Sequence, residues 1–183
     1  MLKFAFALPL IAVCAAFGAD RHGSSVAEIY DREVGMVEHE VLPLAEAMPA
    51  DKYGFAPSHG EFKGVRTFAQ QVGHVAAVIY VVSAAALGEK NPSETGPKEN
   101  GPAALKSKED YVKYLKDALV YAHKAAKSLT AENLTDMVPS PFGTQQVPRV
   151  SMAATVGWHS FDHYGQMVVY ARMNGIVPPA SRQ

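Results

Sequence analysis

Apolar residues recur at alternating steps of three and four along several stretches of the chain, which is the spacing of an amphipathic helix. The first stretch covers residues 25–48 and the second covers 67–88. A third opens at Ser107 and extends to Leu129, and a fourth runs from about Val150 to Asn174. No stretch alternates cleanly with a period of two, as a half-buried strand does. The pattern therefore predicts an all-α protein, most economically a four-helix bundle.

The first three predicted helices begin with a capping box, in which a Ser or Thr and a polar residue three positions later each bond to the other's main chain. The pairs are Ser25 with Glu28, Thr67 with Gln70, and Ser107 with Asp110. Gly88 is a natural stop for the second helix. Because this second helix is apolar nearly all round, we expect it to be deeply buried.

Long segments with several prolines and glycines separate the predicted helices, at residues 48–66, 88–106 and 130–149. The segment 88–106 is long enough to cross the end of a bundle instead of making a tight hairpin. The segment 130–149 has room for a short hairpin. Long loops gathered around a helical core are plausible walls for a functional site.

The first residues have the character of a secretory signal. Lys3 supplies the positive start, Phe4 to Phe17 form the apolar middle, and Gly18-Ala19 are the small residues at the end. The apolar run is too short to span a bilayer. We expect cleavage after Gly18, which leaves residues 19–183 as one exported domain, periplasmic or secreted, without stable membrane insertion. An uncleaved amphipathic start, or a start codon placed too early, is the alternative and leaves the protein cytoplasmic.

Composition narrows the functional classes. Lys+Arg number 17 and Asp+Glu number 18, a formal net charge of −1, so the basic field of a nucleic-acid-binding protein is missing and we expect no nucleic-acid partner. The single cysteine, Cys14, excludes both an intrachain disulfide and a thiolate zinc cage. Any metal site must use His, Asp or Glu. A small molecule is the expected partner, and a homodimer is also possible because dimers are common among helical bundles.

The fourth predicted helix carries the strongest chemical pattern. His159 and His163 lie four residues apart on its core-facing side, which places two imidazoles close enough to bind one ion. Gln166 lies about one turn further on the same face and is placed to orient a ligand or substrate. The alternative is a pair of neutral core histidines whose nitrogens are satisfied by other hydrogen bonds.

A third metal ligand has to come from another segment. His74 lies in the middle of the second predicted helix, on a face shared with Gln71, Val78 and Val81. Spacing alone permits His74 as a ligand without choosing it. The other histidines fit less well, because they lie near the amino terminus, away from the apolar stripe, in a loop, or on a mixed face where solvent is the expected neighbour: His22, His39, His59 and His123 respectively.

Two segments resemble the DinB family. The run from His159 to Pro179, which contains an HxxxHxGQ element, is similar to the carboxy-terminal signature of that family. The run from Asp51 to Pro57, which leads on to Gly73-His74, is similar to its amino-terminal half. The resemblance covers about residues 24–181.

This resemblance implies a four-helix bundle with up-down-down-up topology. It also implies a divalent metal ion, zinc or nickel, held by one histidine of the second helix and a pair from the fourth. Carried over to this sequence, these ligands are His74, His159 and His163. Three imidazoles leave a coordination position for water or substrate. Such an ion lowers the pKa of a bound water or thiol, and the resemblance implies a metal-dependent hydrolase or a transferase that uses low-molecular-weight thiols.

Further residues are candidates for the surroundings of the metal or for the pocket wall. They are Gln166, Tyr170, Asp162, Gln71, Glu33 and Glu40. Trp158 precedes His159, and we expect it to pack against a neighbouring helix.

The sequence also leaves two other functions open. One is a metal-bearing binding or sensing module without turnover, which the lack of an evident general base near the histidines favours. The other is a metal-free helical scaffold whose histidines only fill the core.

Overall fold

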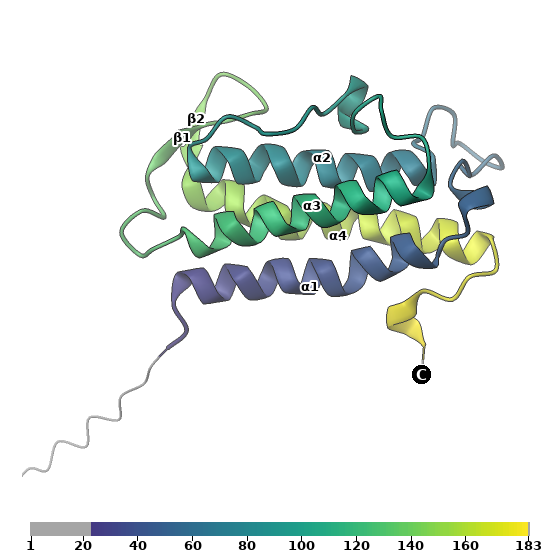
Figure 1. The fold of residues 1–183 in the computed structure, drawn as a ribbon, viewed down its shortest axis with the longest axis horizontal. Coiled ribbons are helices and arrows are strands. Elements are labelled where there is room, and N and C mark those ends of the chain that lie inside the picture. The colour runs from purple at the N-terminus through teal and green to yellow at the C-terminus, as the bar shows by residue number, and fades with distance from the viewer. Residues whose placement is uncertain (1–22, 183) are drawn as a thin grey trace, which may run out of the picture.

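The computed structural model describes residues 23–182, so the predicted signal segment, residues 1–18, lies outside the described residues. Four long helices make up most of the described chain (Figure 1), which confirms the predicted all-α bundle. They are α1 (Val26–Ala47), α2 (Phe68–Leu87), α3 (Lys108–Lys127) and α4 (Arg149–Met173). Short 3-10 turns occur at η1 (Ala50–Lys52), η2 (Pro97–Glu99) and η3 (Pro179–Ser181).

The four helices form a square in which α2 and α1 each pack against both α3 and α4. In Figure 1, α1 and α4 run in one direction, and α2 and α3 run in the other. The connection from α2 to α3 returns along the length of the bundle, because two consecutive helices point the same way. This arrangement is the up-down-down-up topology.

Local sequence signals fix the helix ends. All three predicted capping boxes are formed, at Ser25, Thr67 and Ser107. Gly88 ends α2 in the left-handed conformation, with φ of 71°. Each box satisfies main-chain donors that the first turn of a helix otherwise leaves without a partner. The observed bounds of α1 and α4 agree with the predicted stretches to within about one residue.

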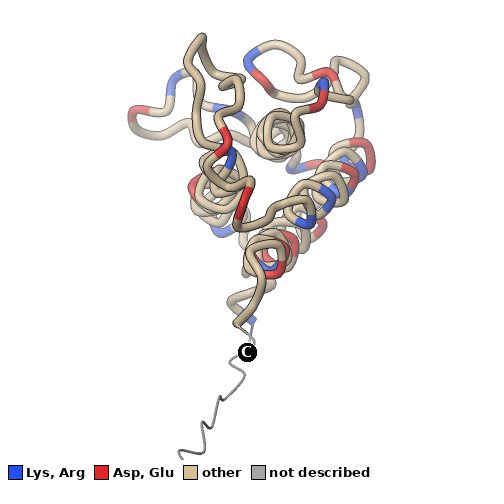
Figure 2. The backbone as a smooth tube through the Cα atoms, turned by 90° about the vertical axis from the view of Figure 1, so that its left-hand side faces the viewer, with Lys and Arg blue, Asp and Glu red and all other residues tan. Residues whose placement is uncertain are grey.

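Helix α2 is the core helix of the bundle. Its length and apolar composition would suffice to cross a membrane, but most of it is buried against the other helices. Figure 2 is turned by 90° from Figure 1, looks along the helices, and shows the charged residues on the other helices and the loops. No Asp, Glu, Lys or Arg occurs in α2. The predicted deep burial of this helix is therefore confirmed.

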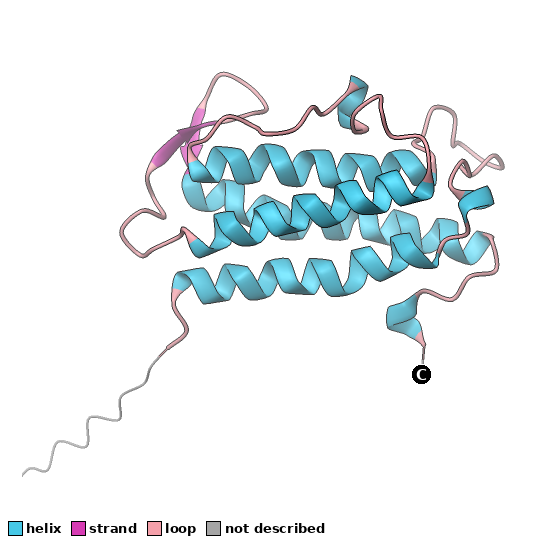
Figure 3. Cartoon of the chain, viewed as in Figure 1, coloured by secondary structure: helices cyan, strands magenta, loops and turns pink. Residues whose placement is uncertain are grey.

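A short hairpin interrupts the segment between α3 and α4 (Figure 3). Strand β1 (Met137–Pro139) pairs antiparallel with β2 (Gln146–Pro148), with Val138 opposite Val147. The last residue of β2 leads directly into α4. The hairpin thus occupies the place for which the sequence left room.

Two expectations about single residues are wrong. Trp158 is 62% exposed and does not pack into a neighbouring helix, because one residue of helical rotation turns it away from the core-facing His159. His123 is not simply solvated. Its Nδ1 lies 2.7 Å from a carboxylate oxygen of Asp31, and its Nε2 lies 3.4 Å from one of Glu38. The face of α3 that carries His123 turns toward α1, which supplies both acceptors.

Candidate metal centre

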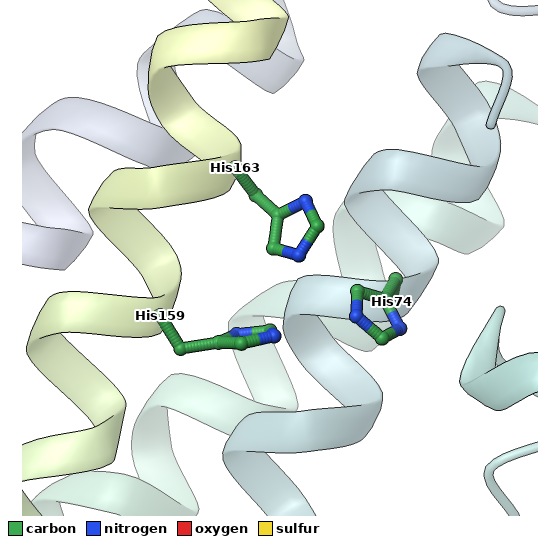
Figure 4. Close-up of side chains that lie close together, drawn as sticks. All are labelled: His74, His159 and His163. Carbon is green, nitrogen blue, oxygen red and sulfur yellow. The ribbon is translucent and has the colours of Figure 1, made fainter. Parts of the chain in front are cut away.

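Three histidine rings converge between α2 and α4 (Figure 4). The ring centroids of His74 and His159 are 5.1 Å apart, and those of His74 and His163 are 4.7 Å apart. The centroids of His159 and His163 are separated by 4.6 Å. One nitrogen from each ring can be chosen so that the three nitrogens lie within 4.8 Å of one another. A group of this kind can hold a metal ion. We refer to these residues as the three-histidine cluster.

The packing of two antiparallel helices produces this convergence. His159 and His163 are four residues apart on α4, and so they project from the same face one turn apart. His74 lies in the second turn of α2, on the side that packs against α4. The rings of His74 and His163 are buried, with 6% and 7% exposure, and His159 is half-buried.

Hydrogen bonds to the second ring nitrogen orient two of the three imidazoles. The Nδ1 of His74 lies 3.0 Å from the main-chain oxygen of Glu99. The Nδ1 of His163 lies 2.7 Å from Oε1 of Gln71. Both oxygens can only accept, so each Nδ1 carries the hydrogen and donates it. The lone pairs of the two Nε2 atoms are therefore free for a metal, the arrangement that oriented histidine ligands require.

The third ring has an unsatisfied polar atom. Among the described residues, none forms a hydrogen bond with the buried Nδ1 of His159. Buried polar atoms without a partner are uncommon and costly in folded proteins. Three converging imidazoles, two oriented by hydrogen bonds and one incompletely satisfied by the protein, are a donor set that fits a divalent ion.

The cluster favours neutral imidazoles. Burial lowers the pKa of His159 to about 3, and the neighbouring rings of His163 and His74 act in the same direction. Burial and the ring of His74 lower the pKa of His163 to about 4. The pKa of His74 is also lowered, first by burial and then by the positive charge of Arg66. A neutral imidazole is the form that binds metal, so the site is in its binding form at neutral pH.

A chain of side-chain amides connects His163 to a carboxylate at the surface. Gln71 accepts from His163, and its Nε2 donates to Oε1 of Gln166 over 2.9 Å. The Nε2 of Gln166 lies 3.4 Å from a carboxylate oxygen of Asp162. Gln71 is 2% exposed, whereas Gln166 and Asp162 are exposed. These hydrogen bonds fix the buried amide of Gln71 in the orientation that accepts from His163.

The loop around η2 supplies the acceptor for His74 at the cost of unusual backbone geometry. Lys98 and Glu99 have φ angles of 56° and 52°, a left-handed backbone conformation that residues other than glycine rarely adopt. The loop lies directly on α2 at Gly73, where a Cβ atom would collide with the main-chain oxygen of Asn100. The strained loop is therefore pressed against the helix at the residue before His74, with the Glu99 carbonyl aimed at the ring.

Arg66 clamps this loop in place. Its Nε donates to Oδ1 of Asn100 over 2.8 Å, and its Nη2 donates to the main-chain oxygen of Lys98 over 3.1 Å. Arg66 is not among the residues that the sequence predicts for the site. The available signal was a cation directly before the Thr67 capping box of the helix that carries His74. The role of the Glu99 carbonyl has no sequence signal, because every residue has a main-chain oxygen.

The other predicted pocket residues are not brought to the cluster in the same way. The hydroxyl of Tyr170 donates to the main-chain oxygen of Arg66 over 3.1 Å, so this buried side chain supports the arginine. Glu33 packs its carboxylate against Gly157, and burial raises its pKa. Glu40 accepts from the hydroxyl of Tyr164 over 2.9 Å and lines a separate groove along α1.

Comparisons with known proteins identify the family and the fold of the chain. The family model of the DinB superfamily matches residues 35–167, a range that contains all three histidines. A DinB-like protein from Bacillus cereus superposes with a TM-score of 0.65 at 18% identity, over 82% of this chain and 93% of that one. A DinB-like protein from Bacillus subtilis gives a TM-score of 0.62 at 15% identity, over 85% of this chain and 99% of that one. At these identities the two structures establish the shared fold. No curated protein sequence matches the chain.

Replacing Gly73 by Ala tests whether the loop around η2 positions His74. The added methyl group forces the loop away from α2, and we expect the free energy of unfolding to fall by about 2 kcal/mol, as for overpacked sites. Metal affinity should fall as well, because the loop carries the acceptor of His74 Nδ1. Thermal unfolding and metal titration are the measurements. The control is Gly35→Ala in α1, where a Cβ meets no atom within 4 Å. If both variants bind metal as tightly as the parent, the loop does not position His74.

Acid should weaken the metal-free fold through the cluster. The three histidines have folded-state pKa values below the ordinary 6.5, so the unfolded chain binds more protons as pH falls from about 6.5 to 4. The contribution of these histidines to the free energy of unfolding is fully present above pH 6.5 and is lost as pH falls through this range. In excess chelator, we expect Tm to drop between pH 7 and pH 5 by about 5 °C more in the parent than in a His159→Gln/His163→Gln variant. Equal drops in the two proteins contradict the expectation.

Proposed function

The chain belongs to the DinB superfamily, since the family model covers most of it, and on this premise we propose that it is a metal-dependent hydrolase or thiol transferase. The proposed ligands of the metal are His74, His159 and His163, and the proposed ion is zinc or nickel. Export after cleavage of residues 1–18 is part of the proposal and rests on the signal-like pattern of that segment.

One observation carries the proposal. Three imidazoles from two helices offer nitrogens within 4.8 Å of one another. In two of the rings the other nitrogen already donates to an oxygen of the protein. Core histidines without a metal need only hydrogen-bond partners, and His159 Nδ1 has none among the described residues. Convergence of free lone pairs is what a metal site requires.

The donor set also supports catalysis over a purely structural role. Three protein ligands leave at least one position open in a tetrahedral site, whereas closed structural zinc sites use four. A divalent ion in such an open site lowers the pKa of water or a thiol toward neutrality and so supplies a nucleophile. The Glu99 carbonyl and Gln71 hold the imidazoles of His74 and His163 in orientation. Arg66 holds the loop that carries the carbonyl.

A metal-bearing binding or sensing module is the second candidate function, and a specific observation favours it. Among the described residues, no carboxylate joins the three histidines as a potential ligand. Asp162 reaches the cluster only through Gln166 and Gln71. Glu33 and Glu40 are held against Gly157 and Tyr164. A hydrolase that needs a carboxylate as general base would have to obtain it by rearrangement.

Metal analysis tests the site. After purification without chelator we expect about one zinc or nickel ion per chain by elemental analysis. His74→Ala and His159→Ala should each lower the affinity of the refilled site by at least about 100-fold, because each removes one of three ligands. The matched control is His39→Ala, whose side chain is exposed on α1. Retention of the parent affinity by both ligand variants excludes the proposed metal site.

An activity screen separates the enzyme from the binding module. Metal-loaded protein is assayed with ester, amide and thiol-acceptor substrates, beside His159→Ala and His39→Ala. The enzyme hypothesis predicts turnover in the parent and the control, with a loss of at least about 100-fold in His159→Ala. Stoichiometric metal without turnover on any of the three substrate classes favours the binding module.

A further inference from the structure

A pocket of about 460 Å³ lies beside the three-histidine cluster. Residues 64–66 directly before α2, the first turn of α2, the loop around η2 and one residue of α4 form its wall. Its polar lining consists of Arg66, Gln70, Gln71, Lys98, Asn100 and Gln166. Gln71 connects the pocket to the cluster because the same amide accepts from His163. The volume is in the range of small-molecule sites.

The charged side chains of this lining have one sign. Arg66 and Lys98 are both cations, and no acidic residue lines the pocket. Among the described residues, neither cation forms an ion pair with a carboxylate. The other polar lining residues are amides, which can donate as well as accept. Two cations without counter-ions beside donor groups create a local excess of positive charge.

Arg66 is held in position with donors to spare. Its Nε and Nη2 each donate to the loop around η2, to Asn100 and to the main chain of Lys98. A guanidinium has five N–H donors in a rigid plane. The other three make no hydrogen bond within the described part of the chain. An arginine fixed by two bonds and left with free donors is preorganised to bind an oxyanion through a pair of parallel hydrogen bonds.

The positive charge of Arg66 is also close to the cluster. It contributes to the lowered pKa values of His74, His159 and His163, after burial in each case. Because Gln71 lines the pocket and also accepts from His163, a ligand whose anionic group occupies the pocket lies next to the proposed metal ligands. The separate groove along α1 differs from this pocket in the charge of its lining, because Asp31 and Glu40 contribute acidic groups there.

We propose that this pocket binds the anionic group of a small-molecule substrate, a carboxylate or a phosphate, next to the three-histidine cluster. Arg66 is its main anchor, Lys98 supplies a second positive charge, and the amides of Gln70 and Asn100 line the same space. The inference rests on the proposed function in one respect, that the bound molecule is a substrate of the metal site. Binding of the anion itself requires only the pocket.

Titration calorimetry with the full-length protein tests the pocket. The probes are malonate, inorganic phosphate and the neutral analogue malonamide, each added to metal-free and to metal-loaded protein. We expect malonate or phosphate to bind the metal-free protein and malonamide to bind at least about 10-fold more weakly, because only the anions pair with the cations. Comparison of the two anions identifies which oxyanion the pocket prefers.

Three variants make the test specific. Lys98→Asn removes one charge and suits the left-handed backbone at this position, where φ is 56°. Arg66→Gln removes the main anchor, but it also loosens the loop, so Lys98→Asn keeps the test informative if Arg66→Gln is unstable. Lys63→Gln is the matched control. Lys63 is exposed in the segment between α1 and α2 that also contains Arg66, and it does not line the pocket. Anion affinity should fall at least about 5-fold in Lys98→Asn and change less than 2-fold in the control.

The outcomes separate this inference from the proposed function. If the metal-free protein binds the anions with the expected variant pattern and no metal binds, the anion-binding proposal is supported and the proposed metal-dependent function is excluded. If metal binds but neither anion does, the pocket proposal is overturned. Equal binding of malonamide, or an equal loss in Lys63→Gln and Lys98→Asn, also overturns it.

Discussion

The packing of α2 against α4 is the contact on which the site depends. Helix α2 has no charged residue and is buried in the bundle, so its position relative to its neighbours is set by apolar burial, the dominant favourable contribution to folding. That burial carries two polar side chains, His74 and Gln71, into the interface with α4. There they meet His163 and its neighbour one turn away, His159.

Burying polar rings in such a core demands partners for their nitrogens, and much of the surrounding structure supplies them. The side chain of Gln71 accepts a hydrogen bond from His163, and a main-chain carbonyl of the η2 loop accepts one from His74. Where the carbonyl reaches the ring, Lys98 and Glu99 adopt a rarely populated conformation, and Gly73 leaves room for the loop because it has no side chain. The strained loop and the absence of a Cβ on the helix thus occur together at the contact that orients one imidazole.

Charge around the cluster is distributed unevenly, and this asymmetry connects the proposed metal to the proposed anion. Burial favours neutral rings at the centre. The cations Arg66 and Lys98 line the pocket, whereas Asp162 contacts the lining residue Gln166 without lining the pocket itself. A cation already fixed by hydrogen bonds loses little conformational freedom on binding, so an anionic ligand gains affinity from it at low entropic cost.

Local patterns along the chain predict the four helices, the capping boxes of α1, α2 and α3, the burial of α2 and the placement of His159 and His163 on one face. These features depend on periodicity and on contacts within a few residues, such as Ser107 with Asp110, which one helix decides alone. Spacing left His74 open, and the resemblance to the DinB family named it. The packing of separate elements brought its ring to the other two, placed the Glu99 carbonyl at that ring and let Arg66 hold the loop. It also turned His123 toward the carboxylates of α1 and left Trp158 in solvent, since the neighbour of a helix face depends on how helices pack.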